Sequence, residues 1–108
     1  MNMIEEIHDI FDDNGFLVDP DLWDRELALR IADQLGIREL GGSHWAVIDY
    51  LRDDFLANAT TPLEGDVCRE LDLVEDCVQR LFGGAIEAWK VAGLPDPEED
   101  ARTFMRDL

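Results

Sequence analysis

Glycine and proline divide this chain of 108 residues into short segments, which limits the fold to an assembly of short elements. Breaks fall at Gly36, Gly41-Gly42, Pro62, Gly83-Gly84 and Pro95. Between them, apolar residues recur at every third or fourth position, the spacing of one face of an α-helix. The pattern predicts a mostly helical single domain that spans residues 1–108.

Helix start and stop signals place the elements of the helical body, residues 19–94. Asp19-Pro20 opens the first helix, since aspartate caps a helix N-terminus and proline fits its first turn. Ser43 is expected to cap the second helix. An apolar stripe through Val67, Leu71, Val74, Val78 and Leu81 predicts one continuous third helix. The predicted helices are 19–35, one beginning at Ser43, 66–82 and 85–92.

The two ends of the chain have their own patterns. Residues 1–18 contain Asn14-Gly15, a tight-turn signal between the short apolar segments 7–11 and 16–18, and predict a small antiparallel β-hairpin or meander. Residues 95–108 predict an amphipathic helix that begins at Pro97, with Ala101, Phe104, Met105 and Leu108 on one face. The expected fold class is therefore α+β, mostly α, with about five helices.

A strong negative charge limits the partners. The chain has 26 acidic and 9 basic residues, a net charge of −17. Such a surface repels nucleic acid and anionic lipid, so neither a nucleic-acid nor a membrane partner is expected. An acidic surface suits binding to a basic protein surface or solubility in a high-salt cytoplasm. A third interpretation is that the acidic residues only solvate the polar faces of the helices. With no apolar segment of transmembrane length and no signal peptide, a cytoplasmic location is expected.

Several short motifs resemble the DsrC/TusE family in order and rough spacing, from about residue 11 to residue 97. The most specific is Lys-x-Ala-Gly-Leu-Pro-x-Pro over residues 90–97, with His44-Trp45 upstream. The other matching segments are Gly15-Phe16-Leu17, Trp23, Ile31-Ala32, Gly36-Ile37, Val47, Arg52, Pro62 and Leu81-Phe82.

The resemblance implies a β-meander packed on about five helices, with one pair similar to a helix-turn-helix. It also implies a role in sulfur metabolism. Members of this family carry sulfur on cysteines and dock on dissimilatory sulfite reductase or on the sulfurtransferase relay for tRNA 2-thiouridine synthesis. The implied partners are therefore subunits of sulfite reductase or of such a relay.

The residues that would carry sulfur in this family are absent from the expected positions. The C-terminal sulfur-bearing cysteine corresponds to about Asp100, and the second redox cysteine corresponds to Trp89. A persulfide needs a thiolate, which neither residue supplies. We therefore expect a non-catalytic protein, not an enzyme, that acts by protein–protein binding or regulation and needs no cofactor.

Cys68 and Cys77 are the two cysteines that the chain contains. On one continuous helix they would point nearly opposite ways and lie roughly 13 Å apart along the axis. The expectation is therefore two separate residues at the edge of the core, unable to form a disulfide. The alternative function is a sulfur carrier that uses Cys68 or Cys77, with Cys68 favoured because it lies nearer a helix N-terminus.

A partner-binding surface is expected around His44, Trp45, Arg52 and Lys90. His44 is interpreted first as a packed side chain with a hydrogen-bonded ring nitrogen, because the sequence offers no metal-ligand spacing around it. The tail helix would cover the body or present Phe104, Met105 and Leu108 to a partner. A third function, DNA binding by the helix-turn-helix-like pair, is disfavoured by the net charge.

Overall fold

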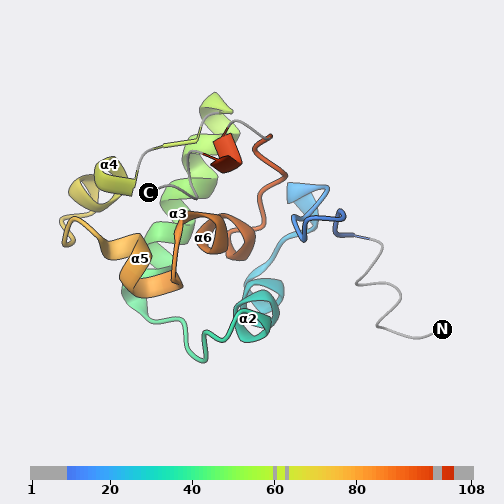
Figure 1. The fold of residues 1–108 in the computed structure, drawn as a ribbon, viewed down its shortest axis with the longest axis horizontal. Coiled ribbons are helices and arrows are strands. Elements are labelled where there is room, and N and C mark those ends of the chain that lie inside the picture. The colour runs from blue at the N-terminus through green and yellow to red at the C-terminus, as the bar shows by residue number, and fades with distance from the viewer. Residues whose placement is uncertain (1–9, 60, 63, 99–100, 104–108) are drawn as a thin grey trace.

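The computed structural model describes residues 10–59, 61–62, 64–98 and 101–103. Short helices meet around a common core in this part of the chain (Figure 1). No helix in the described residues is long and apolar enough to cross a membrane. The helices are the 3-10 helix η1 (Pro20–Leu22), α2 (Arg25–Gln34), α3 (Gly42–Asn58), α4 (Glu64–Glu70), α5 (Cys77–Phe82) and α6 (Ala85–Val91).

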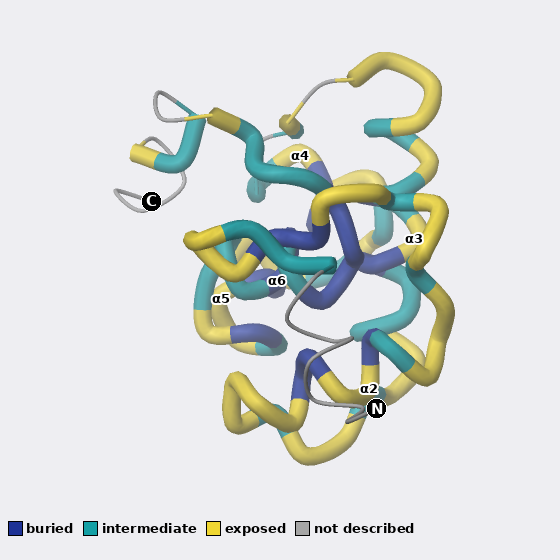
Figure 2. The backbone as a smooth tube through the Cα atoms, turned by 90° about the vertical axis from the view of Figure 1, so that its right-hand side faces the viewer, coloured by how far each residue is buried: buried dark blue, intermediate teal, exposed yellow. Residues whose placement is uncertain are grey.

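Helix α6 lies at the centre of the molecule and packs on α2, α3 and α5. It buries Ala88, Trp89 and Val91, although it is only seven residues long. Figure 2 shows the buried part of the backbone gathered around α6 and the facing side of α3. Because a helix this short is marginal in isolation, its order depends on this packing.

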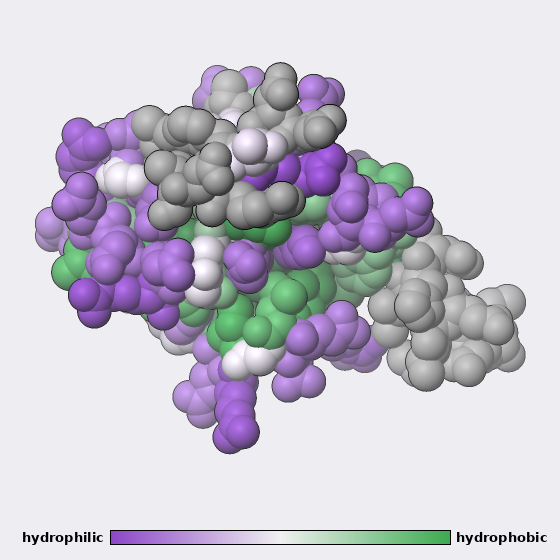
Figure 3. Space-filling view, in the orientation of Figure 1, coloured by the Kyte–Doolittle hydropathy of each residue, from purple (hydrophilic) through white to green (hydrophobic). Residues whose placement is uncertain are grey.

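Helix α3 is the longest element and supports α4, α5 and α6. Val47, Ile48 and Leu51 form its buried side, one turn of a helical stripe. None of the described polar or charged residues is buried. Figure 3 shows hydrophilic side chains around an apolar area at the centre of the face seen in Figure 1, so the acidic residues lie mainly on solvated surfaces.

The first predicted helix is two elements, which corrects its start. The Asp19 carboxylate accepts from the Asp21 N–H and caps only the 3-10 turn η1. Asp24 caps α2 by accepting from the Leu27 N–H at 2.8 Å. Trp23 between them is extended, with φ −76° and ψ 141°, which interrupts the helix and directs its side chain towards the end of α6.

The predicted N-terminal hairpin is reduced to a tight turn and one antiparallel bridge, Phe11 to Leu17. Asp12 closes the turn by accepting from the backbone N–H groups of Asn14 and Phe16. The described residues contain no β-strand and are all-helical apart from turns and connections; residues 7–9 of the prediction lie outside them. A strand does not form because Phe16 and Leu17 are both buried, whereas a two-faced strand alternates.

The predicted helix 66–82 is wrong, because the chain turns back between Glu70 and Cys77. Asp72 has a left-handed φ of 58°, and the Leu73 N–H donates to the Cys68 carbonyl at 2.8 Å, closing the end of α4. Val74, expected in the buried stripe, is 61% exposed. Two short helices therefore replace one, and their apolar sides face each other.

The predicted tail helix does not begin at Pro97. Glu98 has a φ of 81°, which is incompatible with a right-handed helix at that residue. Residues 101–103 are helical, and the Arg102 N–H donates to the Glu98 carbonyl at 2.9 Å. The predicted apolar residues Phe104, Met105 and Leu108 lie outside the described residues.

Candidate functional site

The segment after α6 folds back onto that helix and forms the centre of the candidate site. The Trp89 indole Nε1–H donates to the Pro95 carbonyl at 2.7 Å. Leu94, which directly precedes Pro95 in the chain, is fully buried. The Gly-Leu-Pro motif is therefore an ordered part of the core, with its polar flanks, Lys90 and Asp96, at the edge of the body.

Gly93 is required by the close approach of Trp23. Its φ is 69°, and a Cβ added there would overlap the Trp23 side chain. The Trp23 Nε1–H donates to the Val91 carbonyl at 2.9 Å, which fixes the ring in this position. The segment before α2 and the segment after α6 are thus joined at a backbone position that only glycine fits without strain.

Arg52 of α3 ties the same two segments together. Its Nη1–H donates to the Ala92 carbonyl at 2.9 Å, and its Nη2–H donates to the Pro20 carbonyl at 3.2 Å. Burial lowers the pKa of the guanidinium, and the negative charges of nearby aspartates oppose this shift. Its polar atoms therefore serve intramolecular contacts, although the sequence pattern predicted a docking role.

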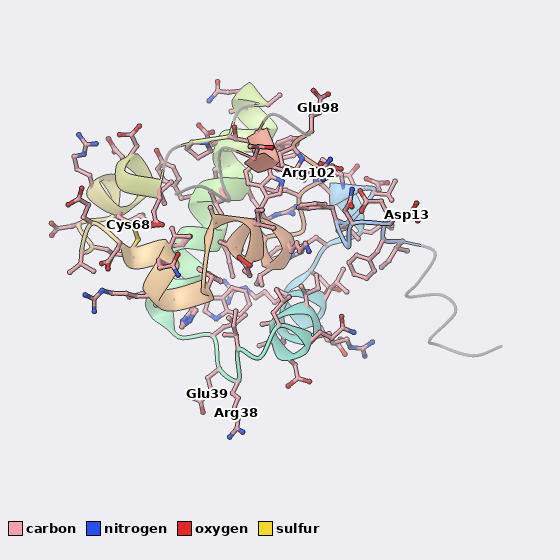
Figure 4. All side chains as sticks on the ribbon, viewed as in Figure 1. Asp13, Arg38, Glu39, Cys68, Glu98 and Arg102 are labelled. Atoms are coloured by element: carbon pink, nitrogen blue, oxygen red, sulfur yellow. A yellow bond between two sulfur atoms is a disulfide. The ribbon has the colours of Figure 1, made fainter. Side chains whose placement is uncertain are left out.

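Asp96 joins three segments at the surface end of the motif. Its carboxylate accepts from the Asn14 amide at 3.4 Å and from the Glu98 N–H at 2.9 Å, and it pairs with Arg102 at 2.9 Å. Figure 4 shows Arg102 in the upper part of the molecule, with Glu98 extending outward near it. The role of Asp96 as a junction between these segments is a structural finding.

Lys90 is half-buried beside the N-terminal turn. Its Nζ lies 5.1 Å from the centroid of the Phe16 ring, a cation–π contact. A Cβ added to Gly15 would be 3.4 Å from the same Nζ. Lys90, Gly15, Asn14 and Asp96 therefore form one small surface, here called the turn–loop surface.

His44 is a packed, hydrogen-bonded residue, as interpreted from its place on the apolar side of the helix. The Gly41 N–H donates to Nδ1 at 3.1 Å, so Nε2 carries the proton that reaches the Leu81 carbonyl at 3.0 Å. The ring meets Phe82 edge-on, with centroids 5.2 Å apart. Gly41, rather than the predicted Ser43, is the N-cap, because the His44 side chain satisfies its N–H.

Trp45 lies under the guanidinium of Arg25, whose Cζ is 4.7 Å from the ring centroid. Trp45 and Arg52 share one side of α3, about 11 Å apart along its axis. His44 reaches the end of α5, and Lys90 reaches the N-terminal turn. The predicted partner-binding residues therefore lie in different parts of the structure, and Lys90 is the one beside the N-terminal turn.

Cys68 and Cys77 form a disulfide, which corrects the expectation that they cannot meet. The S–S distance is 2.01 Å and the Cα atoms are 5.8 Å apart. The reversal between α4 and α5 brings them together, and both are buried. Figure 4 shows Cys68 between these two helices. A sulfur-accepting role for either residue would first require reduction of this bond.

Trp89, expected at a family redox position, is a core residue. It is 2% exposed and meets Phe55 edge-on, with ring centroids 5.8 Å apart. Asp100, expected at the other redox position, lies outside the described residues. Within the described part of the chain, no group of three or more His, Cys, Asp or Glu residues is arranged to hold a metal ion.

A cavity of about 210 Å³ lies beside α2. Its wall includes Phe11, Leu27 and Ile31, with Arg30 at its edge. Ile31 belongs to one of the segments that match the family, whereas Lys90, Arg52 and Asp96 do not line this cavity. Figure 4 shows Arg38 and Glu39 extending from the connection after α2, away from the rest of the chain.

A model of a family described as DsrC like protein matches residues 4–99 of this chain. The chain is 34% identical over 95 residues to proteins named Sulfurtransferase TusE from Salmonella choleraesuis and Escherichia coli, covering 80% of this chain and 86% of each relative.

The solved structures agree with the sequence relatives. The crystal structure of dissimilatory sulfite reductase I (DsrI) contains a chain that superposes with a TM-score of 0.72 at 30% identity, covering 82% of this chain and 86% of that one. The oxidized gamma-subunit of the dissimilatory sulfite reductase (DsrC) from Archaeoglobus fulgidus superposes with a TM-score of 0.69 at 30% identity, covering 82% and 89%. The family match spans most of the chain, and the ordered Gly-Leu-Pro segment lies within it. This chain therefore belongs to the DsrC-like family.

Proposed function

We propose that this protein takes part in sulfur metabolism by binding a protein partner in the cytoplasm, without itself carrying persulfide. The observation that carries the proposal is Trp89. Where the family resemblance leads one to expect a redox cysteine, a buried indole donates a hydrogen bond to the Pro95 carbonyl. A residue committed to the core in this way supplies packing and no sulfur chemistry.

The cysteines support the same reading. The chain has only Cys68 and Cys77, and both sulfurs are bonded to each other inside the body. A sulfur carrier needs an accessible thiolate. The partners would be subunits of sulfite reductase or of a sulfurtransferase relay, since relatives carry those names.

The turn–loop surface is the proposed docking surface. Lys90 supplies a cation there, while Asn14 and Asp96 supply hydrogen-bonding groups that are held by their mutual contact. The rest of the chain is strongly acidic, so the partner surface is expected to be basic overall, with an acidic group opposite Lys90.

A binding assay with purified sulfite reductase and with the sulfurtransferase relay subunits tests this surface. Lys90→Glu is expected to weaken binding by about tenfold or more, because it places like charges together at the interface. Arg38→Glu is the matched control, since it makes the same charge change at an exposed residue in the connection after α2. Equal affinities for the two variants would move the docking surface elsewhere, and no binding to either partner would refute the partner class.

Incubation with a persulfide donor, followed by mass spectrometry, tests the absence of carrier chemistry. The natural chain is expected to gain no adduct, whereas an Asp100→Cys variant is expected to gain about 32 Da, one sulfur atom, on its new thiolate. A stable adduct on Cys68 or Cys77 of the natural chain would instead establish the alternative, a sulfur carrier. That outcome would overturn the proposed non-catalytic role.

The helix-turn-helix alternative loses its main structural element. Its recognition helix was expected over residues 66–82, and that segment is two helices with a reversal between them. DNA binding is therefore not proposed for this protein.

A further inference from the structure

The Cys68–Cys77 disulfide is the covalent link between α4 and α5, across a connection of six residues. We infer that this pair is a reversible redox site that controls whether α4 is held against the rest of the protein. The inference concerns the local order of α4, so it stands independently of the partner and of the proposed docking surface.

Helix α4 has little else to hold it. It is seven residues long, its buried residues are Val67 and Cys68, and it packs on α3 and α5. A helix of two turns does not persist in water without tertiary contacts. After reduction the only apolar side chains that α4 buries are two small ones, Val67 and the Cys68 thiol, and the covalent link to α5 is gone.

The charges on the two helices do not bind them to each other. Residues 64–80 contain six acidic and two basic residues. In the described chain, the ion pairs here are Arg69 with Asp66, at 2.6 Å, and Arg80 with Asp76, at 2.7 Å. Each pair lies within one helix or its cap, so neither ion pair links α4 to α5. The negative charge of Asp76 at the start of α5 instead disfavours the charged form of Glu64 in α4.

Glu64 of α4 faces α5. Its carboxylate lies near the backbone of Gln79, which favours the charged form of the group. Asp76, the N-cap residue of α5, makes no side-chain capping hydrogen bond. Burial raises the pKa of Glu64, so this contact holds a carboxylate at a cost in desolvation. The contact therefore adds less than an exposed cap would, and the disulfide remains the main restraint.

The chemistry is a thiol–disulfide exchange with a protein dithiol or a low-molecular-weight thiol as reductant. Both cysteines are buried, so exchange takes place when α4 opens locally. A reductant thiolate then attacks one sulfur of the Cys68–Cys77 bond, and the other cysteine leaves as a thiolate that takes up a proton. A second thiolate of the reductant then attacks the mixed disulfide. Two cysteine thiols and one reductant disulfide result, and a low-molecular-weight disulfide reverses the reaction with the same two electrons.

Reduction has a structural consequence beneath α4. A small cavity of about 20 Å³ lies between the helices, lined by Val67 of α4, Val78 of α5 and Trp89 of α6. Both valines are sequence neighbours of the bonded cysteines. Movement of α4 would open this apolar cavity to solvent and extend it towards Trp89. The redox state thus sets whether an apolar site is closed or available.

Hydrogen exchange read out by peptide mass spectrometry tests the inference on the full chain. The protein is first oxidised with oxidised glutathione, and half is then reduced with dithiothreitol, which adds about 2 Da. Backbone amides of α4 are expected to exchange at least about tenfold faster after reduction, because the helix opens locally. Amides of α6 are the internal reference and are expected to change little. Reoxidation is expected to restore protection of α4.

A Cys68→Ser, Cys77→Ser double variant is the matched control, and it is expected to behave like the reduced chain in either buffer. If that variant does not fold, the comparison of oxidised and reduced natural chain decides alone. Two free thiols after treatment with oxidised glutathione would overturn the inference. Unchanged hydrogen exchange of α4 on reduction would also overturn it. An equal rise in the exchange of α4 and α6 would overturn it too, because the bond would then stabilise the whole domain and not α4 alone.

Discussion

The guanidinium of Arg52 lies over the indole ring of Trp23, with Cζ 4.2 Å from the ring centroid. In a second cation–π pair, Arg25 of α2 lies over the ring of Trp45 of α3. In the first pair the arginine belongs to α3, and in the second pair it belongs to α2. These crossed cation–π contacts hold the start of the helical body against α3, and Arg52 extends the link to the end of α6.

Replacing Arg52 is expected to destabilise the fold. Arg52→Ala leaves the Ala92 and Pro20 carbonyls without their charged donor and is expected to lower the free energy of unfolding by about 2 kcal/mol. Urea denaturation measures this change. Arg30→Ala is the control, because its ion pair with Glu26 is exposed and contributes less than about 0.5 kcal/mol. Equal losses in the two variants would contradict the anchoring role of Arg52.

Gly93→Ala is expected to cost more than Gly36→Ala. Both glycines have positive φ, 69° and 86°, so each variant pays about 1 kcal/mol for left-handed backbone. At Gly36 nothing lies within 4 Å of an added Cβ, whereas at Gly93 the Cβ overlaps Trp23. The difference in midpoint between the two variants on thermal unfolding isolates the overlap. Identical midpoints would show that Trp23 moves away freely.

Trp89→Cys would place a thiol at the expected family redox position, but we expect it to damage the core first. The indole is buried, contacts Phe55 and donates to the Pro95 carbonyl. Removing most of its volume is expected to cost about 3–5 kcal/mol of unfolding free energy in a urea titration. Leu56→Cys, at a residue 60% exposed, is the control and is expected to change little. A stable Trp89→Cys protein would weaken the structural interpretation of this position.

Glu64 predicts a pH dependence of stability. Burial raises its pKa in the folded state, so the folded protein holds this proton more tightly than the unfolded chain does. Its contribution to the free energy of unfolding is therefore largest below the ordinary value of 4.5 and is lost as pH rises through the raised value.

Glu64→Gln separates this effect from the titration of the other carboxylates. The variant cannot ionise, so its stability relative to the natural chain is expected to improve as pH rises above the ordinary glutamate range. Thermal midpoints of both proteins across that range measure the difference. Glu87→Gln is the control, because it removes one carboxylate from another short helix, α6. Parallel curves for natural chain and Glu64→Gln would show that burial of this carboxylate has no energetic effect.

Local sequence information located several elements correctly. Gly41-Gly42 and Gly83-Gly84 mark the starts of α3 and α6, because glycine interrupts helices wherever they lie in a fold. His44 is packed and hydrogen-bonded as interpreted. The family resemblance, carried mainly by residues 90–97, is confirmed by the family match.

The predictions that failed depended on turns and tertiary contacts that the spacing of apolar residues does not reveal. Residues 66–82 have the periodicity of one helix, and periodicity cannot show that Val74 faces water while the chain turns back at Asp72. The disulfide was missed for the same reason, since the estimated separation of Cys68 and Cys77 assumed an unbroken helix. The bonds from Arg52 to the Ala92 and Pro20 carbonyls were not foreseen either, because charge alone does not reveal which carbonyls a fold will present to an arginine.

The amino-acid sequence by itself determined the mostly helical character, several helix boundaries, the acidic charge and the family, because these follow from local propensity, composition and motif order. Tertiary structure decided where the predicted helix 66–82 breaks and whether Cys68 and Cys77 meet. It also decided which side chains of the motif over residues 90–97 are buried. The physical reason is that burial, bonding distance and hydrogen-bond partners are properties of segments far apart in the chain, and only packing around α6 brings those segments together.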